Sequence, residues 1–169
     1  MEVNELLIEL FERITEHVHE AVDGLDVEAL LTPPEPGTNP IGWLVWHLTR
    51  VQDDHVADIL GEPQLWTTGR WARRFGVAAD AANTGYGHSW SDVTAIKPQN
   101  AEALIEYYEA VATRTRQLLE RTSPTDLDRI VDERWDPPVS LGVRLVSIAD
   151  DDIQHAGQAV YARGVLERR

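Results

Sequence analysis

Two residues that commonly bind metal ions lie four positions apart near the end of the sequence. Asp151 and His155 occur in a segment, residues 147–158, that alternates apolar and polar residues with helical spacing. In a helix, side chains four positions apart lie on one face, with β-carbons about 5–6 Å apart. A carboxylate and an imidazole placed in this way can bind one divalent metal ion. A surface ion pair has the same spacing, and of Asp150, Asp151 and Asp152 we expect at most one to face inward.

A third candidate ligand, His47, lies in a different part of the chain. Its neighbours are mostly apolar, and the helical periodicity of Leu44, Leu48 and Val51 points toward a core. A buried structural histidine would fit this position. If this helix faces the one that carries Asp151 and His155, however, two imidazoles and one carboxylate meet. That set leaves metal coordination positions open for water and substrate.

Other residues could take part in acid–base chemistry or anion binding. His88, in the segment Tyr86-Gly87-His88-Ser89-Trp90, could act as an acid or a base. Arg70, Arg73 and Arg74 form a basic cluster that could capture a carboxylate, because guanidinium groups pair with carboxylates in a fork geometry. The alternative for this cluster is a helix face paired with neighbouring acids.

Four further residues are weaker candidates. His55 is eight positions after His47, about 80° around a helix, so we expect it to be peripheral. Asp54 lies nearly on the stripe of His47 and could orient an imidazole, or it could be an exposed carboxylate. His17 and His19 are expected to face solvent near the end of the first helix.

The elements that must position these residues are four amphipathic helices. The predicted ranges are about 2–23, 40–60, 101–122 and 141–166. Asn39 is expected to cap the second helix, with Pro40 at its first position, and Asn100 to cap the third. With no convincing sheet, the pattern predicts an all-α four-helix bundle that spans residues 1–169 as one domain.

Two connections differ from the helices in composition. Residues 62–98 are rich in glycine and aromatic residues, and contain one short helical candidate around 70–75. A connection this long is uncommon unless it has a function, so we expect a partly ordered excursion that covers a site. Residues 123–140 are expected to be irregular, with a short extended piece at Ile130 and Val131.

Composition excludes several functions. The net charge of −14 and the isoelectric point near 4.7 argue against nucleic acid and against anionic membrane surfaces. No apolar run approaches the ~20 residues of a membrane span, and the N-terminus lacks a signal pattern, so we expect a cytoplasmic protein. There is no cysteine, so any thiol must come from a bound small molecule.

These features resemble the DinB/YfiT-like superfamily of helical metal-binding proteins, especially its actinobacterial mycothiol-dependent branch, which is similar to maleylpyruvate isomerase. The resemblance covers essentially the whole chain. The motifs that carry it are Trp-His-Leu at 46–48, Asp-x-x-x-His-x-Gly-Gln at 151–158, Tyr-x-Arg-Gly at 161–164 and the lead-in at 135–142.

The resemblance implies a metal site formed by His47, Asp151 and His155. Many members carry His where this chain has Asp151, and the thiol-dependent relatives carry Glu, which is one methylene longer. The implied metal is zinc, with nickel and iron as alternatives, and the implied partners are a low-molecular-weight thiol such as mycothiol and a small electrophile. The implied activity is thiol S-transfer or thiol-assisted isomerisation, and similar proteins are often homodimers. A non-haem iron enzyme of sulfur oxidation and a non-catalytic, stress-associated metal-binding module stay open as alternatives.

Overall fold

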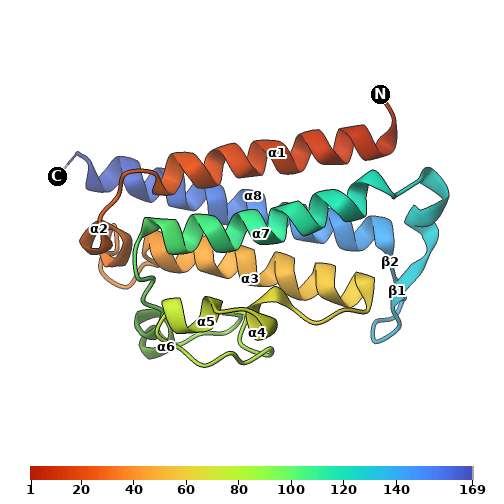
Figure 1. Ribbon diagram of the computed structural model, residues 1–169. Helices are drawn as coiled ribbons and strands as arrows, with labels where there is room; N and C mark the ends of the chain where they lie inside the picture. Colours follow the sequence, from red (N-terminus) through yellow and green to blue (C-terminus); the bar gives the residue numbers. More distant parts are fainter. Residues whose placement is uncertain (169) are drawn as a thin grey trace.

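Four long helices form most of the computed structural model, which describes residues 1–168 (Figure 1). They are α1 (Val3–Val22), α3 (Ile41–Leu60), α7 (Ala101–Glu120) and α8 (Leu141–Leu166). The prediction of an all-α fold is confirmed, and the ends of the four helices fall close to the predicted positions.

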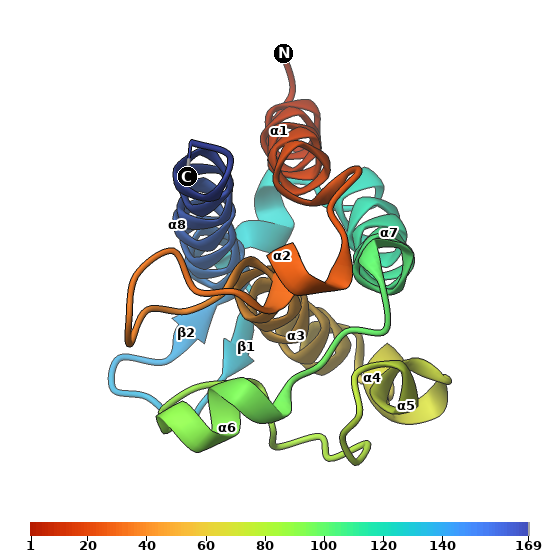
Figure 2. The same ribbon diagram turned by 90° about the vertical axis from the view of Figure 1, so that its left-hand side faces the viewer.

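The four helices are arranged as two pairs of opposite direction. In Figure 1, α1 and α8 run one way and α3 and α7 run the other. Viewed along the helices, α1 and α3 lie diagonally across the bundle, and α7 and α8 occupy the two remaining corners (Figure 2). Helix α3 therefore packs directly against α8 in antiparallel orientation, which is the arrangement that the candidate ligands require.

The helix ends follow from local chemistry. The side chains of Asn100 and Ser140 accept hydrogen bonds from backbone N–H groups in the first turns of α7 and α8, as N-caps do. The predicted cap of α3 was wrong by one residue. Pro40 has extended backbone angles and is itself the N-cap, and α3 begins at Ile41.

The segment between α3 and α7 is more ordered than its composition predicts. It contains three short helices, α4 (Leu65–Thr68), α5 (Trp71–Arg74) and α6 (Trp90–Ala95), of which only α5 was predicted. Trp66 and Phe75 are fully buried and join the core between the long helices. These aromatic side chains fix the segment, because each buries a large apolar surface.

Four small elements complete the structure. They are helix α2 (Val27–Leu31), the 3₁₀ helix η1 (Pro124–Asp128) and the strands β1 (Ile130–Asp132) and β2 (Val139–Ser140). The strands form an antiparallel pair, with Ile130 opposite Ser140 and Asp132 opposite Val139. Only the extended piece at Ile130 was predicted, and the expectation of no sheet was wrong for this hairpin. Within residues 1–168, no helix is long and apolar enough to cross a membrane.

Candidate metal centre

The antiparallel contact between α3 and α8 brings the three predicted ligands together. His47 comes from α3, and Asp151 and His155 come from successive turns of α8. One ligand atom of each residue lies within 4.8 Å of those of the other two. Nε2 of His47 is 3.9 Å from Oδ1 of Asp151, and the two imidazole centroids are 4.6 Å apart. The predicted convergence of these residues is therefore present in the fold.

Both imidazoles are oriented by backbone carbonyls. Nδ1 of His47 is 2.6 Å from the carbonyl oxygen of Thr84, and Nδ1 of His155 is 2.8 Å from that of Asp151. Since a carbonyl oxygen can only accept, each Nδ1 carries the proton and each neutral ring has its lone pair on Nε2. This is the usual arrangement of metal-binding histidines, in which the second nitrogen donates to a fixed acceptor.

The electrostatics of the three residues favour a bound cation. Burial lowers the pKa of His47, because desolvation disfavours the charged ring. Burial acts in the same direction on His155, but hydrogen bonding to Asp151 and its negative charge outweigh it and raise the pKa of His155. Oδ2 of Asp151 is buried and has one long polar contact, 3.4 Å from Nδ1 of His155, a nitrogen that also donates to the carbonyl oxygen of Asp151. A buried carboxylate oxygen with only this long contact is unfavourable, so this donor set fits a divalent metal ion.

An aromatic wall and one loop residue enclose the centre on one side. The Trp43 ring stacks on His47 with a centroid distance of 4.7 Å. The indole N–H of Trp43 donates to Nδ1 of His88, and Nε2 of His88 donates to Oδ1 of Asn83 at 2.8 Å. Both ring nitrogens of His88 therefore have partners, and these two hydrogen bonds attach the loop to α3.

The backbone of Gly85 lies so close to the His47 ring that no residue with a side chain would fit there. Its φ angle is +97°, and a β-carbon there would lie 2.5 Å from Nδ1 of His47. It would also lie 3.1 Å from the Trp46 ring and 3.2 Å from that of Trp43. The loop therefore contacts the ligand through backbone alone, and a glycine is required both for conformation and for space.

We expect Gly85→Ala to weaken metal binding by about 10- to 100-fold, the range found for residues that orient ligands. The added methyl group displaces either the loop or the His47 ring, so the bond to Thr84 is lost. The measurement is zinc affinity by competition with a chromophoric chelator. Gly87→Ala is the matched control, because Gly87 also has a positive φ but a β-carbon there would have no atom within 4 Å. Equal losses in both variants would contradict the prediction.

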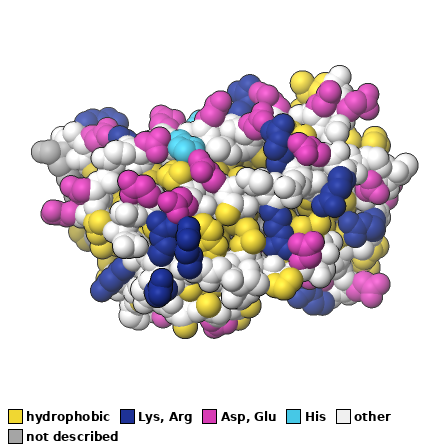
Figure 3. All heavy atoms as spheres, in the orientation of Figure 1, with side chains coloured by type: hydrophobic (Ala, Val, Ile, Leu, Met, Phe, Trp, Pro, Cys, Tyr) yellow, Lys and Arg dark blue, Asp and Glu magenta, His cyan; other side chains and the backbone are white. Residues whose placement is uncertain are grey.

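The predicted basic cluster does not join the centre. Arg74 forms an ion pair with Glu106 of α7 at 2.6 Å and lies beside the Trp71 ring. Arg70 and Arg73 are exposed, on or next to α5. Figure 3 shows Lys and Arg side chains gathered among acidic ones on the face that includes this region. For Arg74, the alternative of a helix face paired with acids is the one observed.

The weaker candidates also lie outside the centre. The ring of His55 lies against Arg144, whose Nη1 is 3.3 Å from His55 Nδ1. Burial, followed by the charge of Arg144, lowers the pKa of His55. Asp54 accepts a hydrogen bond from Gln64 at 2.6 Å and has no bond to His47, so it does not orient that imidazole. His17 is exposed and pairs with Glu20, as expected, whereas His19 is half-buried and lies within ion-pair distance of Asp23 and of Glu109 on α7.

A buried polar group that was not predicted from the sequence lies one turn from His47. Arg50 and Asp53 are fully buried on α3, and the carboxylate of Asp53 accepts hydrogen bonds from the backbone N–H groups of Leu65 and Trp66. The available signal was an arginine on the apolar side of a predicted helix, three positions after a candidate ligand. Charged residues are rarely buried without a partner, so Arg50 could have been identified as a structural centre.

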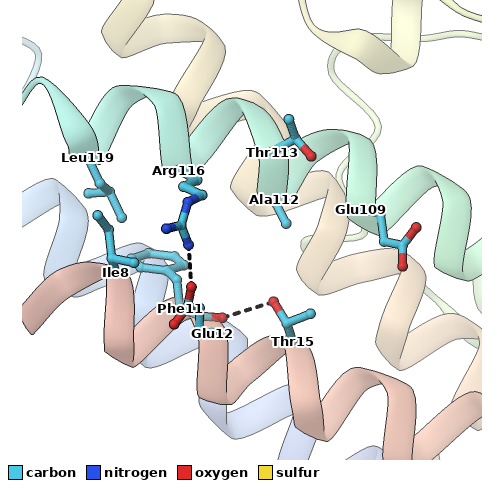
Figure 4. A pocket seen from close by; sticks show the side chains of 9 residues that line it. All are labelled: Ile8, Phe11, Glu12, Thr15, Glu109, Ala112, Thr113, Arg116 and Leu119. Carbon is cyan, nitrogen blue, oxygen red and sulfur yellow. Dashed lines mark hydrogen bonds and ion pairs between the residues drawn. The ribbon is translucent and has the colours of Figure 1, made fainter. Parts of the chain in front are cut away.

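A groove elsewhere on the surface does not include the candidate metal ligands. It lies between α1 and α7, has a volume of about 280 Å³ and is lined by both polar and apolar side chains, the latter including Ile8, Phe11 and Leu119 (Figure 4). An ion pair between Glu12 and Arg116 crosses it. None of the three candidate ligands lines this groove, so it is separate from the centre.

Comparison with known proteins places the chain in a family. A family model described as the DinB superfamily matches residues 10–159. Since this match covers most of the chain, the protein belongs to the DinB superfamily. A solved structure of a conserved protein from Enterococcus faecalis is similar at 28% identity and a TM-score of 0.89, over 100% of this chain and 99% of that one. A search of curated proteins found no match.

Proposed function

We propose that this protein is a metal-dependent enzyme of thiol S-transfer or thiol-assisted isomerisation, acting on a small electrophile. The observation that carries the proposal is the group formed by His47, Asp151 and His155, with ligand atoms within 4.8 Å of one another. Two imidazoles and one carboxylate suit zinc, and nickel and iron are alternatives with similar ligand preferences. Three protein ligands leave a coordination position for a small molecule.

The residues around the centre support this chemistry. A bound divalent ion would lower the pKa of a thiol and supply the thiolate at neutral pH. The chain has no cysteine, so the proposed thiol is a separate small molecule of the mycothiol type. Trp43 and the loop through Gly85 cover one side of His47 and exclude water there. His155 is only about one-fifth exposed and Asp151 about one-quarter, so the open side of the centre lies along α8.

Cobalt-substituted protein tests the proposal directly. We expect a low-molecular-weight thiol to shift and intensify the visible absorption bands of bound cobalt, because sulfur enters the open coordination position. The alcohol analogue of the same thiol, which has oxygen in place of sulfur, serves as the control and should leave the bands nearly unchanged. A spectrum that no thiol alters would contradict thiol activation.

A second candidate function rests on the same donor set. Two histidines and one carboxylate are also the ligands of non-haem iron oxygenases. Under this alternative, the protein is first loaded with iron(II) under anaerobic conditions. When oxygen and a thiol are then supplied, it consumes oxygen. The zinc-loaded protein does not, so oxygen uptake separates an iron enzyme of sulfur oxidation from a thiol transferase.

A non-catalytic role would instead use the surface of the segment between α3 and α7. Tyr86 is 94% exposed and Trp90 is 48% exposed there, and large exposed aromatic residues are typical of protein interfaces. In a metal-binding or stress-associated module, partner binding through these residues would persist after loss of His155. An enzyme would lose turnover with the same substitution.

A further inference from the structure

Arg50 holds the backbone segment that contacts His47. Its Nε donates to the carbonyl oxygen of Asn83 at 3.0 Å, and its Nη2 donates to that of Ala81 at 3.1 Å. The next carbonyl along this segment, that of Thr84, is the acceptor for Nδ1 of His47. The guanidinium group of Arg50 therefore holds the carbonyl groups of Ala81 and Asn83. The carbonyl group of Thr84, in the same segment, holds the candidate ligand His47.

The other donors of Arg50 have acceptors from the surrounding core. Nη2 also donates to Oε1 of Gln64 at 2.8 Å, and Nη1 lies 3.2 Å from the Tyr107 hydroxyl and 3.5 Å from Oδ2 of Asp53. Arginine has five N–H donors, and each has an acceptor here. Arg50 is fully buried, with its guanidinium carbon 5.0 Å from the centroid of the Trp66 ring. The group is thus held on all sides and cannot move without loss of several hydrogen bonds.

We propose that Arg50 is a positioning residue, which keeps His47 in the Nδ1–H tautomer with Nε2 directed to the metal. This inference extends the proposed metal site, because it concerns how the chain prepares one ligand. A buried arginine whose only role is to neutralise Asp53 would not need bonds to Ala81 and Asn83. The planar fork of the guanidinium reaches both carbonyls at once, whereas a lysine carries its donors on a single atom.

The substitution Arg50→Lys separates these two roles. It keeps a positive charge near Asp53 but cannot hold two carbonyls and Gln64 together. Arg114→Lys is the matched control. Arg114 also lies near Asp53, at 3.8 Å, and donates to the carbonyl oxygen of Pro63 at 2.8 Å, but it has no bond to residues 81–84. Both variants lose arginine hydrogen bonds, but only Arg50→Lys loses bonds to residues 81–84.

Two measurements follow, and neither requires enzyme activity. Zinc affinity by chelator competition is expected to fall by about 10- to 100-fold in Arg50→Lys and to stay unchanged in Arg114→Lys. In metal-free wild-type protein, long-range ¹H–¹⁵N NMR spectra are expected to show His47 with a slowly exchanging proton on Nδ1. In Arg50→Lys this proton should exchange rapidly.

Several results would overturn the inference. One is wild-type zinc affinity in Arg50→Lys, and another is an equal loss of affinity in Arg114→Lys, which would indicate general destabilisation. If Arg50→Lys does not fold, the wild-type spectrum still decides, because His47 protonated on Nε2 would contradict the role of Arg50. If wild-type protein binds no metal, the proposed function fails, while the NMR result still tests the positioning of His47.

Discussion

Replacement of either histidine ligand, His47→Ala or His155→Ala, is expected to abolish tight binding of a divalent metal ion. Each substitution leaves one imidazole and one carboxylate, too few to hold zinc tightly at a site open to water. We expect the affinity to fall by more than about 100-fold, because residues that only orient ligands already contribute 10- to 100-fold. The measurement is elemental mass spectrometry of purified, untagged protein, followed by chelator competition.

His17→Ala is the control for adventitious binding by exposed histidines. His17 lies on α1 and pairs with Glu20, so its loss should leave metal content unchanged. Asp151→Asn tests the third ligand, since it keeps an oxygen at the same position but removes the charge. If wild-type protein stays empty after metal loading, Asp151 does not replace the longer Glu or the His of related proteins, and the metal site is disproved.

The three candidate metal ligands could be predicted from sequence because helical spacing and apolar periodicity are local properties. Asp151 and His155 share a helix, and the position of His47 depends only on which face of α3 points inward. That the two helices face each other was one possible packing of a four-helix bundle, and the family resemblance implied the same ligand set; the structure shows this packing. The contribution of Gly85 and Thr84 could not be predicted, because it depends on how residues 62–98 fold back onto α3 through the burial of Trp66 and Phe75.

The dependence on tertiary contacts also explains why the short helices α4 and α6 were not predicted. Helices such as α4 and α6 have too few residues for helical periodicity to be recognised, and their stability comes from tertiary contacts. Asp53, for example, accepts hydrogen bonds from the first turn of α4, from a position 12 residues earlier in the chain. Such a contact between distant positions cannot be predicted from a local sequence pattern.

The expectation that at most one residue of Asp150–Asp152 faces inward was wrong. Asp150 is exposed, whereas Asp151 is half-buried and Asp152 is fully buried. Both carboxylate oxygens of Asp152 lack a hydrogen-bond partner among residues 1–168. Burial, together with the neighbouring charge of Asp151, raises the pKa of Asp152 well above its ordinary value. Burial also raises the pKa of the nearby Tyr108, and the charge of Asp152 adds to that effect.

The buried carboxyl group makes stability depend on pH in a definite direction. In the unfolded chain Asp152 ionises near its ordinary pKa of 3.8, but in the folded protein it stays protonated to higher pH. Below pH 3.8 both states are protonated and the group has no effect. Above it, the free energy of unfolding falls by about 1.4 kcal/mol per pH unit until the raised pKa is reached. The contribution of this group therefore becomes less favourable as pH rises.

Asp152→Asn is accordingly expected to stabilise the metal-free protein at pH 7, because it removes the free energy that the unfolded chain gains by ionising this carboxyl group, about 1.4 kcal/mol for each pH unit between 3.8 and the raised pKa. For a chain of this size, each kcal/mol of added stability raises the Tm by about 2–4 °C. Asparagine has the same shape but cannot ionise, so the gain should shrink toward zero as the pH approaches 4. The measurement is denaturant unfolding of both proteins from pH 4 to 8, after chelator treatment.

Asp150→Asn is the matched control for this prediction, because Asp150 is exposed on the same helix and its carboxylate accepts a hydrogen bond from the side chain of Gln154. It should change neither the stability nor its pH dependence. A loss of stability in Asp152→Asn that is equal at all pH values would mean that the carboxylate is ionised and partnered in the folded protein. A gain in the free energy of unfolding that grows with pH would instead mean that Asp152 destabilises the folded protein. The chain would then retain a destabilising acid directly beside its candidate metal ligand, and folding alone gives no reason to retain it.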